Sequence, residues 1–233
     1  MALSPLSHAT NLSRIHSSDD ADVFVASEPG PPGASSEAFV FAPIDLEQHG
    51  AWCASVRAET FAVSFDSDVM FWEEAGQGGT FYLEALRERM QWNPGSCVLL
   101  WKGEQWVGML ELKPYGADPS VGYVNTFYLV PESRGLGWTR WLELYVQHFF
   151  ASLGITTIRL TVSPANLRAV SYYQQAGWEH IGELSVSAGW LRRYNSAVPG
   201  ASDFLATALD ETGQSPSCPE GESVYLMEKR YEG

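Results

Sequence analysis

Hydrophobic and polar residues alternate along the chain with periods that separate strands from helices. Ile158, Leu160 and Val162 occupy every second position, as in a strand with one buried face. From Trp138 to Phe149 the large apolar residues recur at intervals of three and four, which is the spacing of an amphipathic helix. These two segments predict a helix followed directly by a strand.

The same periods divide the rest of the chain into further elements. They predict strands at 38–41, 97–101, 106–112, 121–130, 158–162, 178–184 and 224–231. They predict helices at 45–63, 81–92, 138–149 and 166–176. Asp45 and Gln48 fit a capping box that opens the first helix, Thr80 fits a cap for the second, and Gly177 ends the last.

The order of these elements predicts a fold class. The turn at 102–105 joins two strands as a hairpin, and the strand at 121–130 is expected antiparallel to the second of them. The strand–helix–strand unit at 121–163 requires a right-handed parallel crossover inside this antiparallel sheet. The class is therefore α+β, with a mixed, mostly antiparallel sheet and helices on both faces.

Composition divides the chain into an extension, a domain and an insertion. Residues 1–37 contain Pro-Gly pairs and are expected to be a flexible N-terminal extension, in which the apolar Val23–Val25 could add an edge strand. Residues 38–233 are expected to form a single domain. Residues 185–223 are rich in Ser, Gly and Pro, which predicts a functional insertion or a mobile lid.

The overall charge and the cysteines exclude several classes of partner. The chain has 14 Lys and Arg against 28 Asp and Glu, so its net charge of −14 disfavours nucleic acid and anionic membranes and favours a cationic partner. Three widely spaced cysteines form no disulfide framework or metal site. The sequence has no apolar run of about 18 residues and no secretory signal, so the expected location is the cytoplasm, without a membrane partner.

One glycine-containing turn precedes the clean amphipathic helix. The segment Leu129–Thr139 joins the end of a strand to that helix and contains Gly135 and Gly137. Exposed N–H groups at the positive end of the helix dipole can bind a phosphate or pyrophosphate, and Arg134 adds a positive charge. Ordinary turn glycines are the alternative interpretation, because neither GxxxxGK[ST] nor a complete GxGxxG is present.

A second motif favours the phosphate-binding interpretation over ordinary turn glycines. Its residues are Asn166, Ala169, Tyr173 and Gly177. Together the two segments resemble the GNAT superfamily of acyl-CoA N-acyltransferases over residues 96–184. The cofactor motif [QR]xxGx[GA], entered from a Val-Pro pair, is similar to 134–139, and the later motif NxxAxxxYxxxGF is similar to 166–178 with Trp178 in place of Phe. Thr139 departs from the usual Gly or Ala; its side chain crowds a backbone–phosphate contact, although its hydroxyl could donate to the phosphate.

The resemblance implies a fold with a splayed parallel strand pair that holds acyl-CoA, and acetyl-CoA as the co-substrate. It implies that Tyr173 is the general acid that protonates the leaving thiolate, and that Asn166 contacts the pantetheine region. It further implies that backbone groups of Leu129 and Val130 pair with the pantetheine arm. The pyrophosphate would lie on the loop formed by Arg134, Gly135, Leu136, Gly137, Trp138 and Thr139.

The implied reaction is direct attack of an amine on the thioester, so no cysteine and no metal is required. The group that removes the amine proton is left open. Glu111 is a candidate base, with a solvent-facing strand charge as the alternative, and Tyr123 or Asn125 beside the splayed strand could act through water.

The distribution of charge suggests where the acceptor binds. Residues 1–78 carry a net charge of −10, residues 79–184 carry −1 and residues 185–233 carry −3. Acids and aromatics alternate at Asp66, Asp68, Phe71 and Trp72, which suits a cationic amine through ion pairing and cation–π contact. An acidic solubilising surface whose aromatics pack into the core is the alternative.

The leading hypothesis is an acetyl-CoA-dependent N-acetyltransferase acting on a primary amine of a cationic small molecule or a peptide. A non-catalytic acyl-CoA-binding or regulatory protein of the same fold is one alternative. A protein N-terminal or lysine acetyltransferase that uses the 185–223 insertion is another, and the chain is expected to be a monomer or a homodimer.

Overall fold

The computed structural model describes residues 11–16, 22–27, 38–116, 118–185 and 223–231. The strands are β1 Asn11–His16, β2 Asp22–Ser27, β3 Phe39–Pro43, β4 Cys97–Lys102, β5 Gln105–Tyr115, β6 Asp118–Leu129, β7 Thr157–Val162, β8 Glu179–Ser185 and β9 Ser223–Arg230. The helices are α1 Leu46–Phe65, α2 Val69–Ala75, α3 Thr80–Trp92, α4 Thr139–Ser152 and α5 Leu167–Gln175.

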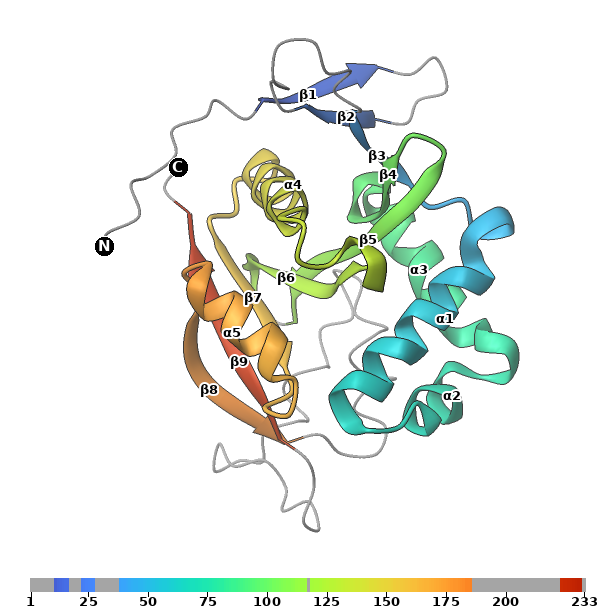
Figure 1. Ribbon diagram of the computed structural model, residues 1–233, viewed down its shortest axis with the longest axis vertical. Helices are drawn as coiled ribbons and strands as arrows, with labels where there is room; N and C mark the ends of the chain where they lie inside the picture. The colour runs from blue at the N-terminus through green and yellow to red at the C-terminus, as the bar shows by residue number, and fades with distance from the viewer. Residues whose placement is uncertain (1–10, 17–21, 28–37, 117, 186–222, 232–233) are drawn as a thin grey trace.

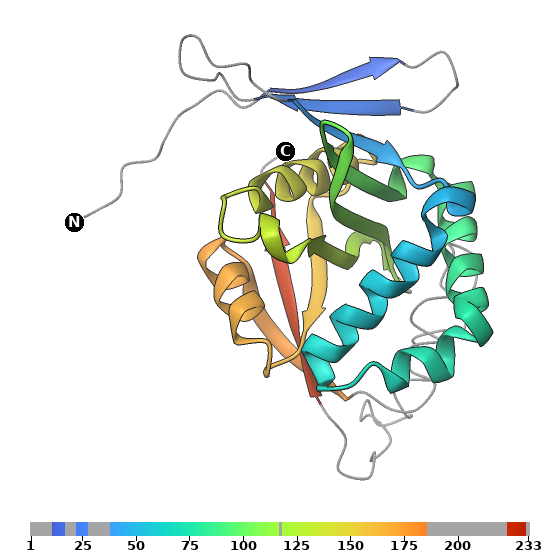
Figure 2. The ribbon, with the colours of Figure 1, turned by 45° about the vertical axis from the view of Figure 1, so that its right-hand side comes forward.

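The strands form one sheet in the order β1-β2-β3-β4-β5-β6-β7-β9-β8. Only the β6–β7 pair is parallel among these neighbours, as the crossover through α4 requires. Figures 1 and 2 show α1, α2 and α3 on one side of the sheet and α4 and α5 on the other. The predicted α+β class, with a mixed, mostly antiparallel sheet covered on both faces, is confirmed.

Each face of the sheet has its own hydrophobic core. Trp141, Leu142 and Phe150 of α4 pack with residues from six strands in one cluster. Phe61 of α1 and Leu86 of α3 belong to the second cluster, against β4 and β5. The apolar spacing from Trp138 to Phe149 therefore marks the face of α4 that is buried against the sheet.

Most predicted elements are confirmed to within a few residues. The residues at the starts of α1 and α3 test the two predicted helix caps. The Asp45 carboxylate caps α1 as predicted, accepting from the backbone N–H groups of Glu47 and Gln48 at 2.9 and 3.2 Å. The other half of the capping box is not formed, because the Asp45 N–H donates to His49 Nδ1 at 3.2 Å rather than to Gln48. The prediction that Thr80 caps α3 is wrong. Gly79, at φ 79°, occupies the cap and Thr80 is the first helical residue, because a short turn of glycines changes the chain direction there.

Two further strands and one helix extend the predicted set. Val23–Val25 lie in β2, which pairs with β3 and carries β1 on its outer edge (Figure 2). The helix α2 has seven residues, too few for a hydrophobic period to reveal it. The predicted insertion at 185–223 lies almost entirely outside the described residues. Within the described ranges, none of the helices has both the length and the apolarity that crossing a bilayer requires.

The sheet divides between β6 and β7. The parallel pairing runs only from Val121 to Val124 on β6, while β6 continues beside β5 as far as Leu129. A bulge interrupts the β5–β6 register at the same level, so that Asn125 has no direct partner between Val124 and Thr126. Beyond this bulge one edge of β6 has lost its β7 neighbour, which is the splayed pair that the resemblance implies.

We expect Gly122→Ala to destabilise the fold by about 1–3 kcal/mol, because overpacking a core costs roughly that much. A Cβ at Gly122 would lie 2.5 Å from the fully buried Phe150 ring. Gly182→Ala is the matched control in β8, since its Cβ would meet nothing within 4 Å. Urea unfolding measures both. Equal midpoints would contradict the tight contact, and Phe150→Leu should partly rescue the Gly122 variant.

Candidate active site

A cavity of about 500 Å³ opens where β7 leaves β6. Its walls come from α1, the split part of β6, the end of β7, α5 and the loop at 134–139. Cavities of this size are typical of small-molecule sites. Most of the predicted cofactor residues and both β6 acceptor candidates meet here, although they come from distant parts of the chain.

The glycine loop has the geometry of an anion site. Gly135 and Gly137 have φ angles of 79° and 78°, a region that favours glycine. A Cβ on either residue would meet no atom within 4 Å, so open space adjoins the backbone. No side chain caps the first turn of α4, which begins at Thr139. Its N–H groups and the helix dipole therefore favour a pyrophosphate at this loop.

Not every predicted loop residue lines the cavity. Arg134, Gly135, Gly137 and Thr139 do. Leu136 is exposed, with 56% of its surface accessible. Trp138 packs edge-on against the Phe39 ring at 5.0 Å, so its indole contributes to the core rather than to a ligand site.

Arg134 ties the loop to the neighbouring elements. Its Nε donates to the carbonyl of Leu129 at 2.8 Å, and its terminal NH2 donates to Glu59 of α1 at 2.8 Å. Glu59 also accepts from the Tyr128 hydroxyl at 2.5 Å. The guanidinium thus positions the loop against α1 and β6. Sequence reasoning missed Glu59, because nothing in the pattern distinguishes it from other acids of a partly exposed helix.

The split edge of β6 presents alternate backbone groups to the cavity. Val130 donates its N–H to Val107 at 3.0 Å, and its carbonyl accepts from Ser133 at 2.9 Å. The Val130 N–H is therefore used within the protein, but its carbonyl keeps a second lone pair, and the pantetheine contact of Val130 stays a prediction. Because pairing alternates along an antiparallel strand, Leu129 and Phe127 direct their backbone away from β5 toward the split. The Leu129 carbonyl is held by Arg134, and Phe127 was not predicted.

Tyr173 and Asn166 face the cavity from α5 and the turn before it. Burial raises the pKa of Tyr173, and the neighbouring Tyr172 and Glu143 raise it further, so its phenol stays protonated and can act as a hydrogen-bond donor. Asn166 caps α5 by accepting from the Ala169 N–H at 3.2 Å. This cap fixes the asparagine at the cavity wall.

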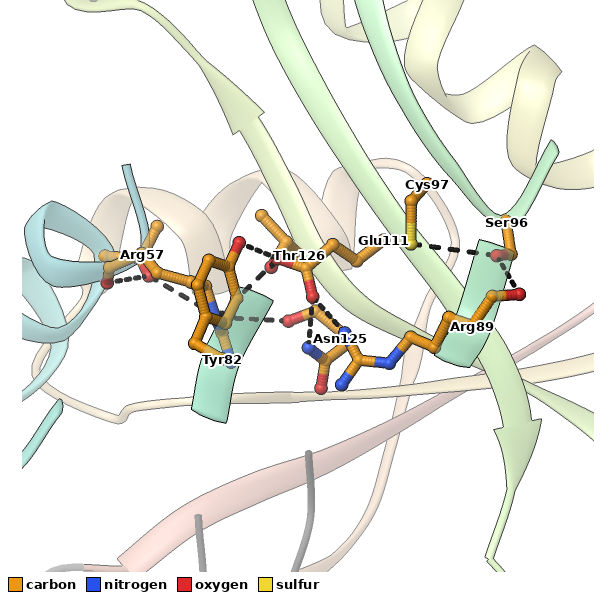
Figure 3. Close-up of polar contacts among 9 residues, drawn as sticks. Arg57, Tyr82, Arg89, Ser96, Cys97, Glu111, Asn125 and Thr126 are labelled. Atoms are coloured by element: carbon orange, nitrogen blue, oxygen red, sulfur yellow. Dashed lines mark hydrogen bonds and ion pairs between the residues drawn. The ribbon is translucent and has the colours of Figure 1, made fainter. Parts of the chain in front are cut away.

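Glu111 does not have the placement of a base. It is fully buried and does not line the cavity, which corrects both the base and the solvent-facing interpretations. It pairs with Arg89, and it accepts hydrogen bonds from three further side chains (Figure 3): Tyr82 at 2.8 Å, Thr126 at 2.8 Å and Asn125 at 2.7 Å. Burial acts to raise the pKa of Glu111, but the Arg89 and Arg57 guanidiniums hold it below its usual range. A carboxylate of low pKa whose two oxygens already accept hydrogen bonds is a poor proton acceptor.

The two other β6 candidates line the cavity, but their polar groups are engaged. The Tyr123 hydroxyl contacts the Thr161 hydroxyl at 2.7 Å and accepts from its N–H at 3.1 Å. The Asn125 amide donates to Glu111 at 2.7 Å. Both side chains therefore shape the split strand before any ligand binds.

The predicted acceptor residues of the acid–aromatic segment do not line the described cavity, although Phe65, directly before Asp66, does. Phe71 is buried in the core between Phe61 and Tyr82. Asp68 accepts from the indole N–H of Trp72 at 3.0 Å, and Asp66 ends α1 at a positive φ of 56°. Phe71 of α2 packs into the core, as the alternative that the sequence left open expects, whereas Trp72 keeps 38% of its surface exposed. Instead α1 supplies the wall, with Arg57 and Thr60 among the residues that were not predicted.

These features define a class of protein. A sheet split beside a bulge, an anion-binding loop at the start of α4 and a buried tyrosine donor are arranged for acyl transfer from a long phosphorylated donor. The comparisons with known proteins agree with this class.

Residues 66–178 match the family model described as "Acetyltransferase (GNAT) family". A kanamycin resistance protein of Rhizobium radiobacter is 29% identical over 92 residues, which cover 40% of this chain and 80% of that protein. The PaiA N-acetyltransferase of Thermoplasma acidophilum, solved with coenzyme A, superposes with a TM-score of 0.54 at 16% identity over 83% of this chain and 99% of that one. Spermidine N-acetyltransferase of Vibrio cholerae, solved with CoA and spermine, gives 0.54 at 14% identity over 82% and 95%.

The chain contains a GNAT-family acetyltransferase domain over residues 66–178, and both motifs lie within this matched region. It is an acyltransferase, and acetyl-CoA is its co-substrate. The resemblance inferred from the two motifs is thereby confirmed at the level of family, fold and donor.

We expect Glu111→Gln to lower the free energy of unfolding by about 3 kcal/mol or more, because breaking a buried pair leaves Arg89 uncompensated. The folded-state pKa of Glu111 lies below its ordinary value of 4.5. Its stabilising effect is therefore complete above that value and is lost as the pH falls through the lower folded-state pKa.

Denaturant unfolding between pH 7 and pH 3 measures this effect, and the variant should show a flatter dependence on pH. Glu84→Gln is the control, since Glu84 pairs with Arg87 on the exposed face of α3 and should cost about 0.5 kcal/mol or less. Parallel pH curves for the wild type and Glu111→Gln would contradict the assignment.

Proposed function

We propose that the protein transfers the acetyl group of acetyl-CoA to a primary amine of a small molecule or peptide. The observation that carries the proposal is that the glycine loop, Tyr173 and α1 line the same cavity. One end suits the pyrophosphate, the middle suits the thioester and the far end leaves room for an acceptor. Family membership supports the reaction type, and the acceptor side supports an amine of moderate size.

In the proposed mechanism the neutral amine attacks the thioester carbonyl directly. The N–H groups of Phe127 and Leu129 at the split edge polarise the carbonyl oxygen and stabilise the developing oxyanion. As the new C–N bond forms, the C–S bond breaks and the Tyr173 phenol donates a hydrogen bond to the departing thiolate. The thiolate takes a proton from solvent, which balances the proton that solvent takes from the amine, so CoA leaves as a thiol and no covalent enzyme intermediate is needed.

Solvent accepts the proton of the amine in this proposal. Among the described residues that line the cavity, Glu59 is the one carboxylate, and it is held by Arg134 and Tyr128. Water in the cavity relays the proton past Tyr123 and Asn125, whose polar groups lie along the wall.

The evidence on the charge of the acceptor amine points in two directions. The net charge of −14 favours a cationic acceptor, and a relative is named for kanamycin resistance. Of the acids that produce this charge, however, Glu59 is the one that the described cavity wall contains, and it is paired with Arg134. A protein acceptor that uses the 185–223 insertion and a purely regulatory role are the alternatives, and the following experiment separates them.

The experiment follows release of free thiol from acetyl-CoA with polyamines, aminoglycosides, amino acids and short peptides. We expect release with at least one class, and loss of kcat by about 100-fold or more in Tyr173→Phe, in the range for general acids. Binding of acetyl-CoA should be unchanged. Tyr145→Phe is the control, because this buried hydroxyl donates to Gly95 away from the cavity.

The conditions also separate the alternatives. A cationic acceptor that is bound by charge should show a KM that rises with salt. A regulatory role predicts that acetyl-CoA raises the melting temperature while no amine releases thiol, and that result would overturn the catalytic proposal.

We expect Gly137→Ala to weaken acetyl-CoA binding by about 10-fold or more, because a side chain at a positive φ distorts the loop and reduces the approach of the phosphate. Gly154→Ala is the matched control. Gly154 has a φ of 74° and equally open surroundings, but it lies in the turn after α4. Both variants should lose similar stability, and only the loop variant should lose affinity in calorimetry. Equal affinities would contradict the phosphate site.

A further inference from the structure

Three buried basic side chains lie together beside the split strand, and burial holds the pKa of one of them, Lys113, well below its usual range. Arg57 of α1, Arg89 of α3 and Lys113 of β5 have 7%, 2% and 3% of their surfaces exposed. The buried carboxylate in contact with this group is Glu111. Figure 3 shows Arg57 and Arg89 on either side of this carboxylate. The cluster therefore contains more buried basic groups than acidic ones among the described residues.

Glu111 does not provide Arg57 with a close partner. Its two oxygens already accept from four other side chains, and the nearest approach of the Arg57 Nε is 3.9 Å. Arg57 donates through one terminal nitrogen, to the Asn125 carbonyl at 3.2 Å and to Thr60 at 3.5 Å. Its Nε has no hydrogen-bond partner. A guanidinium with five N–H donors is thus buried with few of them used.

Arg57 is also part of the cavity wall, with 9% of its side chain exposed. The Phe61 ring lies 5.3 Å from the guanidinium carbon and supports the planar group. The carbonyl that it contacts belongs to Asn125, the bulge residue at which β6 separates from β7. Arg57 is therefore fixed next to the point where acetyl transfer is proposed.

Burying a charge is costly unless a counter-ion pairs closely with it, and the counter-ion of Arg57, Glu111, lies at 3.9 Å and already accepts from four other side chains. An arginine fork is matched best by a carboxylate, which accepts two parallel hydrogen bonds. The other basic residues of the described wall, Arg134 and Arg168, lie by the glycine loop and α5. Arg57 is the basic residue on the α1 side, where the acceptor enters.

We propose that Arg57 binds a carboxylate of the acceptor, so that the substrates are amines that also carry a carboxylate, such as free amino acids. This inference rests on the proposed N-acetyltransferase function and names its substrate class. The acceptor's anion lies on Arg57 and Phe61, and its amine reaches the thioester at the split of β6 and β7. Arg57 then sets specificity and takes no part in bond formation.

The test compares each amino acid with its own α-amide, which keeps the side chain and the amine but lacks the anion. Thiol release from acetyl-CoA gives kcat/KM for both members of each pair. The wild-type acid-to-amide ratio should fall by about 10- to 100-fold in Arg57→Gln, as loss of a charged hydrogen bond implies. In Arg57→Lys the acid-to-amide ratio of kcat/KM should lie between those of the wild type and Arg57→Gln. Because ratios are compared between variants, differences in amine basicity cancel.

Arg87→Gln on the exposed face of α3 is the control, and it should keep the wild-type ratio. Unfolding curves and acetyl-CoA binding should show that Arg57→Gln is folded. An equal loss of kcat/KM for acids and amides would overturn the inference, because it would mean that Arg57 acts on the acetyl group or on the fold.

Failure of the proposed function gives a different result. If no amine releases thiol, calorimetry of the CoA-loaded protein with N-acetyl amino acids and with their amides still tests the anion site. Tighter binding of the acid that is lost in Arg57→Gln supports the site without catalysis. Equal binding of acid and amide overturns it.

Discussion

The buried carboxylate of Glu111 is the interaction on which the site depends. It connects β5 to the bulge of β6 through Asn125 and Thr126, and it connects both strands to α3 through Arg89 and Tyr82. A bulge leaves backbone and side-chain groups without strand partners. Glu111 supplies a partner for the Asn125 and Thr126 side chains, and its contacts with α3 hold the bulge in place. Hydrogen bonds in such a desolvated site are strong, so the network makes the bulge rigid.

The bulge in turn decides where the sheet can open. β6 must keep its pairing with β5 on one side, and it gives up β7 just beyond Val124. The freed edge would be a liability in an ordinary sheet, since its N–H groups lack partners. Here α1 and the glycine loop border the opening, and the Arg134–Glu59 pair joins them. The cavity is therefore held open by the same contacts that anchor its walls.

Charge acts on two length scales in this protein. The net charge of −14 governs solubility and long-range approach, whereas the described cavity wall contains three arginines and one engaged carboxylate. An average over the chain therefore predicts a cationic partner, while the groups within contact distance favour an anion. Short-range interactions dominate once the site is desolvated, because the effective dielectric constant falls.

The sequence alone determined the order of elements, the parallel crossover and the two motifs, because each depends on local period or spacing, as in 158–162 and 134–139. The positions of Gly137 and Tyr173 in the cavity followed from those motifs. Tertiary structure decided what Glu111 and Arg57 do. The hydrophobic pattern of a sequence does not tell whether a carboxylate on a strand or an arginine on a helix is exposed to solvent or buried. Only packing between α1, α3 and the bulge removes water from them, and removal of water turns a surface charge into an anchor or a binding group.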